Sequence, residues 1–466
     1  MHRGRLVVGA LAALVAGCSG AQPVPPTGPE PTAESGGYQY PAPPRVSAGP
    51  LADVADDAVA GLVAGLSEDE FDTTAVEGIA ESNEARLGWF LSDLLRFIQR
   101  GPEQQQLLAA FEAVTGVDPS GDPAFATSPW RSVTNHLIAW DLPAHPGYRE
   151  DKASLFTLVE PGWLPFFDDA ESGIDWRIVS WGGVLIDDRP LGDQQPCPRG
   201  CIPALDDPAL VSGDAGDWYP DDALVFGVEV GGEAVAFPKN VMEVHELVNI
   251  SVGGRRLGVP YCTLCGSAQA YLTDEVPAGR DPLVLRTSGL LSRSNKVMYD
   301  LETLSVFDTF TGEAVSGPLH RAGLVLEEVS VVTAPWGQWR ASHPAGRIVA
   351  EDAGIGGTYP ADPLQGRDDA GPIFPIGPVD ERLPVQAQVL GVVAPDGTAV
   401  AFPVDQALAA LGRGGLVSVG EIEAYVDAGG LRARTASGGD LATHQAFWFA
   451  WSQFHPTTLV WTPIGL

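Results

Sequence analysis

The chain has 466 residues, of which 45% are hydrophobic, so it can bury a large core and is long enough for two or more domains. This composition excludes a fibrous or disordered protein. The formal net charge of −33 would repel nucleic acid phosphates, and because no strongly basic run offsets it, we expect no nucleic acid partner.

The first residues are typical of an export signal. Basic residues precede an apolar run at 6–15, which is too short for a permanent membrane span. The sequence Leu-Val-Ala-Gly-Cys at 14–18 resembles a lipobox. We therefore expect residues 1–17 to be a lipoprotein signal peptide and Cys18 to carry lipid. The mature protein would then be extracytoplasmic and anchored to a bacterial membrane through that lipid.

Residues 18–50 are rich in Pro, Gly and Ser and contain little apolar surface to bury, as expected of a solvated tether. Residues 51–174 show helical periodicity and should form a helical domain. The clearest amphipathic face comprises Leu87, Phe90, Leu91, Leu94, Leu95 and Ile98, and Gly101-Pro102 should end that helix. Further helices are predicted around 107–114, 133–140 and 152–158. We assign no chemistry to this domain, and expect His136 and His145 to be packing or surface residues.

From Asp175 the hydrophobic period changes to that of strands, so residues 175–466 should form a β-rich domain. A strand is predicted at 176–186, followed by a long loop at 187–218. The overall fold class is therefore α+β, with a helical amino-terminal domain followed by the β-rich domain.

The β-rich domain contains an internal repeat. Residues 224–238 match 389–403; each segment is typical of a β-hairpin that ends at a proline, and each is followed by a short predicted helix. Residues 266–272 also match 420–426, with Gly266 aligned to Gly420. These matches predict two related halves about 165 residues apart. Only the first half has a cysteine pair, which indicates a repeated scaffold with one specialised site.

That pair is Cys262 and Cys265, in a Cys-x-x-Cys-Gly sequence between predicted strands at 252–261 and 268–272. Two thiols at this spacing on a turn converge on one point. They can form a structural disulfide, act as an exchangeable thiol pair, or supply half of a tetrahedral metal site. The spacing does not choose among the three. As the first thiol of the pair, Cys262 is the expected attacking thiol.

Other residues could assist the pair. His245 lies in a short helical run and could act as a general base or a charge partner for a thiolate. In a zinc or copper site, Cys262 and Cys265 would need further ligands, for which Cys197, Cys201, His245 or His455 are candidates, with Met298 as a softer option for copper. Polar residues that could support the site are Asn249, Asn295 and Asp300.

The five cysteines can be assigned to one lipidation site and two close pairs. Cys18 is assigned to lipid, which leaves the close pairs Cys197/Cys201 and Cys262/Cys265. An exported compartment is oxidising enough to hold both pairs as disulfides. Cys197 and Cys201 would then fasten their own loop or exchange with the second pair.

Several motifs occur in the order found in a known family. These are His245-Glu-Leu-Val-Asn249, Val259-Pro-Tyr-Cys-Thr-Leu-Cys-Gly-Ser-Ala268, Ser288-Gly-Leu-Leu291, Asn295-Lys-Val-Met-Tyr-Asp300, Thr311-Gly-Glu-Ala314 and Phe447-Trp-Phe-Ala-Trp451. Over roughly 180–462 the chain resembles domain-of-unknown-function family 3179, and its helical part resembles the amino-terminal extension of longer members. The family has no assigned activity. Some members are described as selenoproteins, which implies a redox-active position within the pair aligned with Cys262 and Cys265.

We therefore expect thiol/disulfide redox chemistry at Cys262 and Cys265, supported by His245, with an unidentified redox partner. The first alternative is a zinc or copper binding module without catalysis, supplied by a metal donor. The second is a structural surface lipoprotein with two disulfides.

Overall fold

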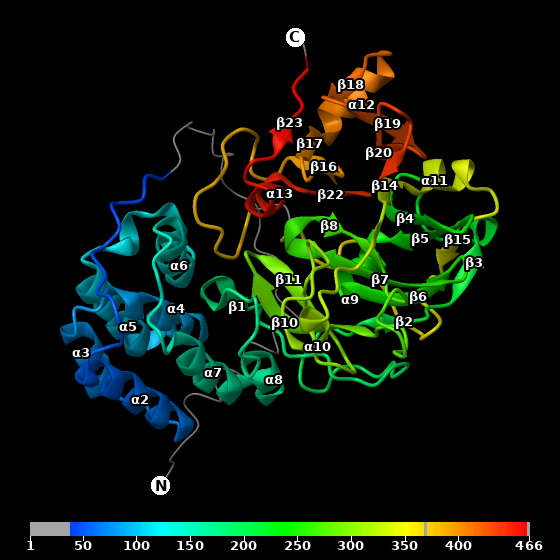
Figure 1. The fold of residues 1–466 in the computed structure, drawn as a ribbon. Coiled ribbons are helices and arrows are strands. Elements are labelled where there is room, and N and C mark those ends of the chain that lie inside the picture. The colour runs from blue at the N-terminus through cyan, green and yellow to red at the C-terminus, as the bar shows by residue number, and fades with distance from the viewer. Residues whose placement is uncertain (1–37, 368–370, 464–466) are drawn as a thin grey trace. The chain divides into compact units, whose positions relative to one another are not determined.

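The computed structural model describes residues 38–367 and 371–463 (Figure 1). The expected signal peptide, Cys18 and most of the tether lie outside these residues. The chain divides into two compact units. Unit 1 comprises residues up to Asp168 together with Asp175–Val184 and Phe374–Val379, and unit 2 comprises Asp169–Ile174, Leu185–Ile373 and Asp380–Leu466. No helix of the described residues is both long and apolar enough to cross a membrane.

Unit 1 is mainly helical, as the sequence periodicity predicts. Its helices are α2 (Asp53–Ser67), α3 (Thr73–Glu81), α4 (Gly88–Phe97), α5 (Gly101–Thr115), α6 (Pro129–Ala139), α7 (Tyr148–Val159) and α8 (Leu164–Phe167). The predicted face of α4 is buried, except that Ile98 lies just past the helix and is half-buried. Gly101-Pro102 does not end α4 but begins α5, where proline is tolerated because the first-turn N–H groups have no helical partner.

Two buried polar side chains of unit 1, Lys152 and His136, are paired within the unit. Lys152 is fully buried, and its ammonium group donates to Asp93 at 2.8 Å, to the Tyr148 hydroxyl at 3.0 Å and to the Val179 carbonyl at 2.7 Å. His136 contacts the Ser132 carbonyl and the Tyr38 hydroxyl, so it is a packing histidine as expected. The strand predicted at 176–186 is mostly wrong. Only β1 (Val179–Trp181) forms, because a single 3₁₀ turn precedes it and Gly183 has a positive φ of 95°.

In the described part of the chain, the strands of unit 2 fall in five small sheets in a propeller-like arrangement (Figure 1). The strands of its first half are β2 (Leu205–Asp206), β3 (Leu210–Ser212), β4 (Leu224–Val230), β5 (Glu233–Pro238), β6 (Leu247–Val252), β7 (Arg255–Cys262), β8 (Ser267–Ala268), β9 (Ala270–Leu272), β10 (Leu285–Ser292), β11 (Asn295–Asp300), β12 (Val306–Asp308), β13 (Glu328–Val329), β14 (Val331–Pro335) and β15 (Arg347–Val349). Its helices are α9 (Lys239–His245), α10 (Gly317–Arg321) and α11 (Trp336–Ser342).

The second half is shorter. It comprises strands β16 (Gln388–Val393), β17 (Ala399–Pro403), β18 (Val417–Val419), β19 (Ile422–Asp427), β20 (Gly430–Thr435), β21 (Asp440–Leu441), β22 (Thr443–Phe447) and β23 (Leu459–Val460), with helices α12 (Val404–Gly412) and α13 (Trp448–Phe454). The two predicted hairpins are β4–β5 and β16–β17, and the helices expected after them are α9 and α12. Unit 2 is therefore built of two related halves.

The topology extends this repeat beyond the hairpins. One sheet contains the strand order β14-β4-β5-β15, and another has the order β22-β16-β17-β23. In both, the first three strands are antiparallel and the fourth runs parallel to its neighbour. A second pair of sheets contains β6-β7-β9-β13 and β18-β19-β20-β21, all antiparallel. Each half therefore contributes the same two sheets.

The same topology corrects the finer alignment. The sheet position of β19 is that of β7, so residues 420–426 correspond to the β6–β7 hairpin and not to residues 266–272. Gly253, like Gly420, lies in the tight turn before the equivalent strand, and φ is 57° at both, as it also is at Gly266. The sequence match therefore pairs Gly420 with a glycine of the same conformation in a different turn.

Each half also repeats a glycine–tryptophan contact. A Cβ atom on Gly227 would lie 2.3 Å from the Trp339 ring, and one on Gly391 would lie 2.0 Å from the Trp451 ring. Both tryptophans are buried at the second turn of equivalent helices, α11 and α13. Glycine is therefore required in β4 and β16 because each indole packs directly on the strand backbone.

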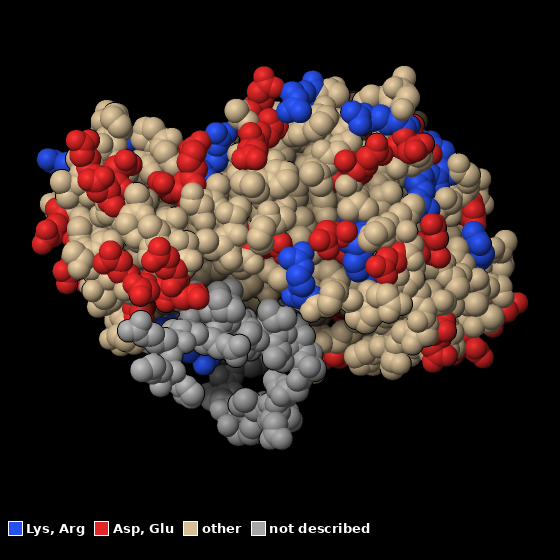
Figure 2. Space-filling model, turned by 90° about the horizontal axis from the view of Figure 1, so that it is seen from below, with Lys and Arg blue, Asp and Glu red and all other residues tan. Residues whose placement is uncertain are grey.

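Acidic side chains are distributed over the face drawn in Figure 2, and basic side chains lie singly or in small groups among them.

Candidate functional site

The Cys-x-x-Cys sequence forms a turn at the end of β7, as predicted. Cys262 is the last residue of that strand, Thr263–Cys265 form one 3₁₀ turn, and Ser267 pairs back with Cys262. Gly266 closes the turn with φ of 57°. A side chain at Gly266 would be strained by this φ, and its Cβ would lie 2.9 Å from the Phe447 ring. The local sequence therefore forces the two thiols into a compact, fixed loop.

Both thiols are buried and neither forms a disulfide. The side chains of Cys262 and Cys265 are 1% and 0% exposed. Both sulfur atoms are directed at one acceptor, the Ser294 carbonyl oxygen, which lies 3.3 Å from Cys265 Sγ and 3.9 Å from Cys262 Sγ. Leu264 and Gly266, next to the thiols in sequence, are half-buried, so the pair lies just beneath the surface of unit 2.

The facing wall is the hairpin of β10 and β11. Arg293 and Ser294 occupy its two turn positions with φ of 49° and 70°, the backbone of a type I′ turn, in which both central residues have positive φ. This conformation points the Ser294 carbonyl at the thiols. It also places Lys296, two residues further on, beside the same pair.

Lys296 and Glu246 bring opposite charges to the thiols. Lys296 is buried, and its ammonium group donates to the Glu246 carbonyl oxygen at 2.5 Å and lies 3.4 Å from Glu246 Oε2. Glu246 Oε1 in turn accepts a hydrogen bond from Thr263, inside the Cys turn, at 2.9 Å. The cation and the carboxylate are therefore coupled directly to the loop that carries the thiols.

These contacts separate the two thiols in acidity. Burial alone raises the pKa of Cys262. The hydrogen bond from Cys265 and the peptide N–H and ammonium group of Lys296 outweigh burial and the Glu246 charge, so the pKa of Cys262 lies below its ordinary value. Burial and the neighbouring Cys262 sulfur hold the pKa of Cys265 well above its ordinary value. The arrangement therefore favours ionisation of Cys262 over Cys265, whose single S–H group lies within reach of both the Cys262 sulfur and the Ser294 carbonyl oxygen.

Unpaired polar atoms occur on the segments that carry and face this pair. Within the described part of the chain, the Ser294 hydroxyl, both polar atoms of the Asn295 amide and the Ser267 hydroxyl are buried without a hydrogen-bond partner. Buried polar groups without partners are costly, and they recur where a protein binds water or a reactant. The structure thus places Asn295, one of the predicted supporting residues, in the hairpin that faces the thiols.

The structure directs His245 elsewhere. Its Nδ1 atom lies 2.8 Å from the Pro203 carbonyl oxygen, and its Nε2 atom lies 2.8 Å from the Tyr359 hydroxyl. Both ring nitrogens are thus engaged with groups other than the thiols. Lys296, the residue that does contact Cys262, lies within the motif Asn295-Lys-Val-Met-Tyr-Asp300, but nothing in that motif indicates that the β10–β11 hairpin brings it to the thiols.

Asn249 and Asp300 also have structural partners. The Asn249 amide donates to Asp206 at 2.9 Å and exchanges hydrogen bonds with the Leu285 backbone. Asp300 accepts from the backbone N–H groups of Val284 and Thr303. These contacts fasten strands and cap a turn, so the structure does not bring either residue into contact with the thiols.

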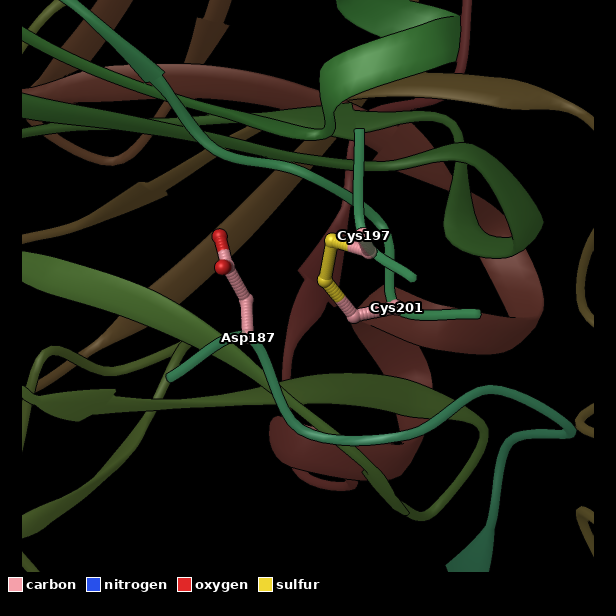
Figure 3. Close-up of side chains that lie close together, drawn as sticks. All are labelled: Asp187, Cys197 and Cys201. Atoms are coloured by element: carbon pink, nitrogen blue, oxygen red, sulfur yellow. A yellow bond between two sulfur atoms is a disulfide. The ribbon is translucent and has the colours of Figure 1, made fainter. Parts of the chain in front are cut away.

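Cys197 and Cys201 form a disulfide, with a Cα–Cα distance of 5.3 Å. Figure 3 shows the Asp187 carboxylate beside the bonded sulfur atoms. This is the one grouping of three possible metal ligands among residues 38–367 and 371–463. It does not suit a metal ion, since bonded sulfurs are poor ligands and the Asp187 carboxylate accepts from Arg189 at 2.6 and 2.8 Å.

The described residues do not bring the predicted soft-metal ligands together. No grouping of three ligands among the described residues includes Cys262, Cys265 or His245, whereas a zinc site needs three or four converging ligands. The alternative with two structural disulfides also fails, because Cys262 and Cys265 are free.

The fold and the site together define the class of protein. It has a helical unit and a duplicated β unit, and one half of the β unit carries a buried dithiol beside a lysine. Comparison with protein families matches residues 199–437 to the family described as "Protein of unknown function (DUF3179)". The chain belongs to this family. Searches of the curated proteins and of the solved structures found no match.

Proposed function

We propose that Cys262 and Cys265 form a two-electron thiol/disulfide redox centre. The observation that carries the proposal is the pair of unbridged thiols facing one carbonyl, with Lys296 beside the first thiol. A neighbouring cation does not stabilise a structural disulfide, which is uncharged, whereas it does stabilise an attacking thiolate.

The reaction follows thiol–disulfide exchange. The Cys262 thiolate attacks a substrate disulfide, forms a mixed disulfide and releases one substrate thiol, which takes a proton from water. Cys265 then loses its proton and attacks Cys262 Sγ, which closes the Cys262–Cys265 disulfide and releases the second thiol. Two electrons pass from the dithiol to the substrate, and the reverse sequence oxidises a substrate dithiol. Because both thiols are buried, the Cys turn must open locally or the substrate must be small.

Trapping the mixed disulfide tests this function. Glutathione disulfide should form a stable adduct on Cys262 in a Cys265→Ser variant, because no second thiol can release it. The matched Cys262→Ser variant should remain unmodified, since the pKa of Cys265 is raised. Mass spectrometry of the intact protein reads both results. An adduct on neither variant, or on Cys265 alone, would contradict the assigned order of attack.

We further propose that the protein is exported and held at a bacterial membrane by lipid on Cys18, with no nucleic acid partner. The sequence at 14–18 and the Cys197–Cys201 disulfide support export, because disulfides persist in oxidising compartments. The full chain should partition into detergent, and a Cys18→Ala variant should lose both its lipid mass and this partition. Detergent partition that is unchanged by Cys18→Ala would refute lipid anchoring.

A further inference from the structure

Glu246 holds Lys296 through both its main chain and its side chain. The Glu246 carbonyl oxygen accepts a hydrogen bond from the Lys296 ammonium group at 2.5 Å, and Glu246 Oε2 lies 3.4 Å from the same nitrogen. The carbonyl oxygen also accepts from the Tyr261 N–H at 2.8 Å, so it is fixed to β7, the strand that ends at Cys262. One residue thus sets the position of the cation beside the thiols.

The backbone of Glu246 is in the left-handed conformation that favours glycine. Its φ is 53°, at the end of α9, where its N–H donates to the Met242 carbonyl oxygen. In the second half, the segment that follows the equivalent helix α12 has Gly414 with φ of 76°. Glycine adopts such a φ without steric cost, and it would offer the same carbonyl oxygen without a carboxylate. The strain accepted at Glu246 therefore indicates a use for its side chain.

That side chain lies between the lysine and the Cys turn. Glu246 Oε1 accepts from the Thr263 hydroxyl at 2.9 Å, and Thr263 directly follows Cys262. The Glu246 side chain is 14% exposed and that of Lys296 is 5% exposed, so water screens their charges poorly. One ammonium group therefore has two anionic neighbours, the Glu246 carboxylate and the Cys262 thiolate.

The two anions act against each other. Burial is the largest influence on the pKa of Lys296, which it lowers, and the charges of Glu246, Cys262 and Asp187 oppose that effect. Burial also acts to raise the pKa of Cys262 and of Cys265, and the Glu246 charge raises both further. A disulfide carries no charge and does not experience this repulsion. The Glu246 carboxylate therefore disfavours the reduced pair relative to the disulfide.

We propose that Glu246 sets the reduction potential of the Cys262–Cys265 pair by sharing Lys296 with the Cys262 thiolate. The inference rests on the redox function proposed above. In reduction, a substrate dithiol supplies two electrons, the S–S bond breaks, and one proton is taken up, which gives a Cys262 thiolate and a Cys265 thiol. Lys296 then divides between two anions, whereas in the disulfide form it pairs with Glu246 alone. Glu246 is a positioning residue that makes the pair a stronger reductant.

Removing the charge alone tests this inference. Glu246→Gln keeps an oxygen that can accept from Thr263 but has no charge. The full chain carrying Cys197→Ser and Cys201→Ser is equilibrated in glutathione buffers, and the free thiols are trapped by maleimide. In Glu246→Gln the equilibrium constant for forming the dithiol should rise several-fold, so the reduction potential becomes less negative. The pH inflection of iodoacetamide alkylation at Cys262 should move to lower pH.

Two further variants separate charge from strain and from general damage to α9. Glu246→Gly copies Gly414 and relieves the left-handed strain, yet it should shift the potential in the same direction as Glu246→Gln because both lack the carboxylate. Glu243→Gln, at a carboxylate of the same helix that pairs with Lys239, should leave the potential and the inflection unchanged.

The outcomes distinguish this inference from the function on which it rests. A reversible transition in the unmodified protein with an equal or more negative potential in Glu246→Gln would overturn the inference alone. A Cys262 inflection at higher pH in Glu246→Gln would also overturn it, because Glu246 would then serve to keep Lys296 charged. Absence of any reversible transition in the unmodified protein would refute the redox function, and the inference with it.

Discussion

Each half of unit 2 forms its own copy of the same two sheets, and the halves differ in how one pair of strands is joined. In the second half Ala428 and Gly429 join β19 to β20 in a tight turn. In the first half the equivalent strands, β7 and β9, are separated by the Cys turn and β8, and the insertion after β9 supplies the β10–β11 hairpin that covers the thiols. The two repeated sheets form the common framework of both halves, whereas the thiols and Lys296 proposed for chemistry lie in the segments that distinguish one half from the other.

The largest expected effect tests the shared framework. Gly227→Ala and Gly391→Ala should each destabilise the protein by about 3 kcal/mol, because the added methyl group would overlap an indole ring and overpacking is costly. Gly412→Ala is the matched control, since a Cβ there meets nothing within 4 Å. Denaturant unfolding measures all three. Unequal losses at Gly227 and Gly391 would break the equivalence of the halves.

A smaller effect is expected at the loop before the repeat. Replacing Cys197 and Cys201 by serine should lower the free energy of unfolding by about 2 kcal/mol, the chain-entropy value for so short a closed loop. Glutathione trapping at Cys262 in the Cys265→Ser background should be unaffected, because the disulfide fastens a loop and does not take part in exchange. Loss of trapping would instead make the two pairs redox partners.

A third prediction concerns charge at the site. Removing the ammonium group in Lys296→Met should raise the pKa of Cys262, because a cation beside a thiolate stabilises it. Iodoacetamide alkylation followed against pH reads this pKa, and its inflection should lie below that of an ordinary thiol in the unmodified protein. Lys239→Gln, at a lysine paired with Glu243, is the control and should leave the inflection in place.

The smallest effect is a pH dependence of stability. Because the pKa of Cys265 is raised in the folded protein, that thiol stays protonated where an unfolded chain would ionise. Its contribution to stability is therefore complete below the ordinary thiol pKa and is lost as pH rises above it. Unfolding measured between about pH 7 and 10 should show this loss in the unmodified protein and less of it in Cys265→Ser. Equal slopes would show that Cys265 is not held in its protonated form.

Much of the fold could be predicted because local patterns specify it. Helical periodicity predicts α4 to α7, and the proline-ended hairpins reveal the repeat. No local pattern predicts the contacts of Gly227 with Trp339 and of Gly391 with Trp451. The site was predicted only in part. The thiols stand adjacent in sequence, whereas Lys296 and Ser294 reach them through a distant hairpin, and the partners of His245 come from two loops remote in sequence. Contacts of that kind depend on tertiary packing, which no local pattern encodes.

The most direct test of the redox centre is a titration of the full chain, carrying Cys197→Ser and Cys201→Ser, in glutathione buffers of defined potential, with free thiols trapped by maleimide. A reversible two-electron transition of Cys262 and Cys265 above roughly −300 mV is predicted. Thiols that stay reduced at every potential, or a bridge that glutathione cannot reduce, would contradict it.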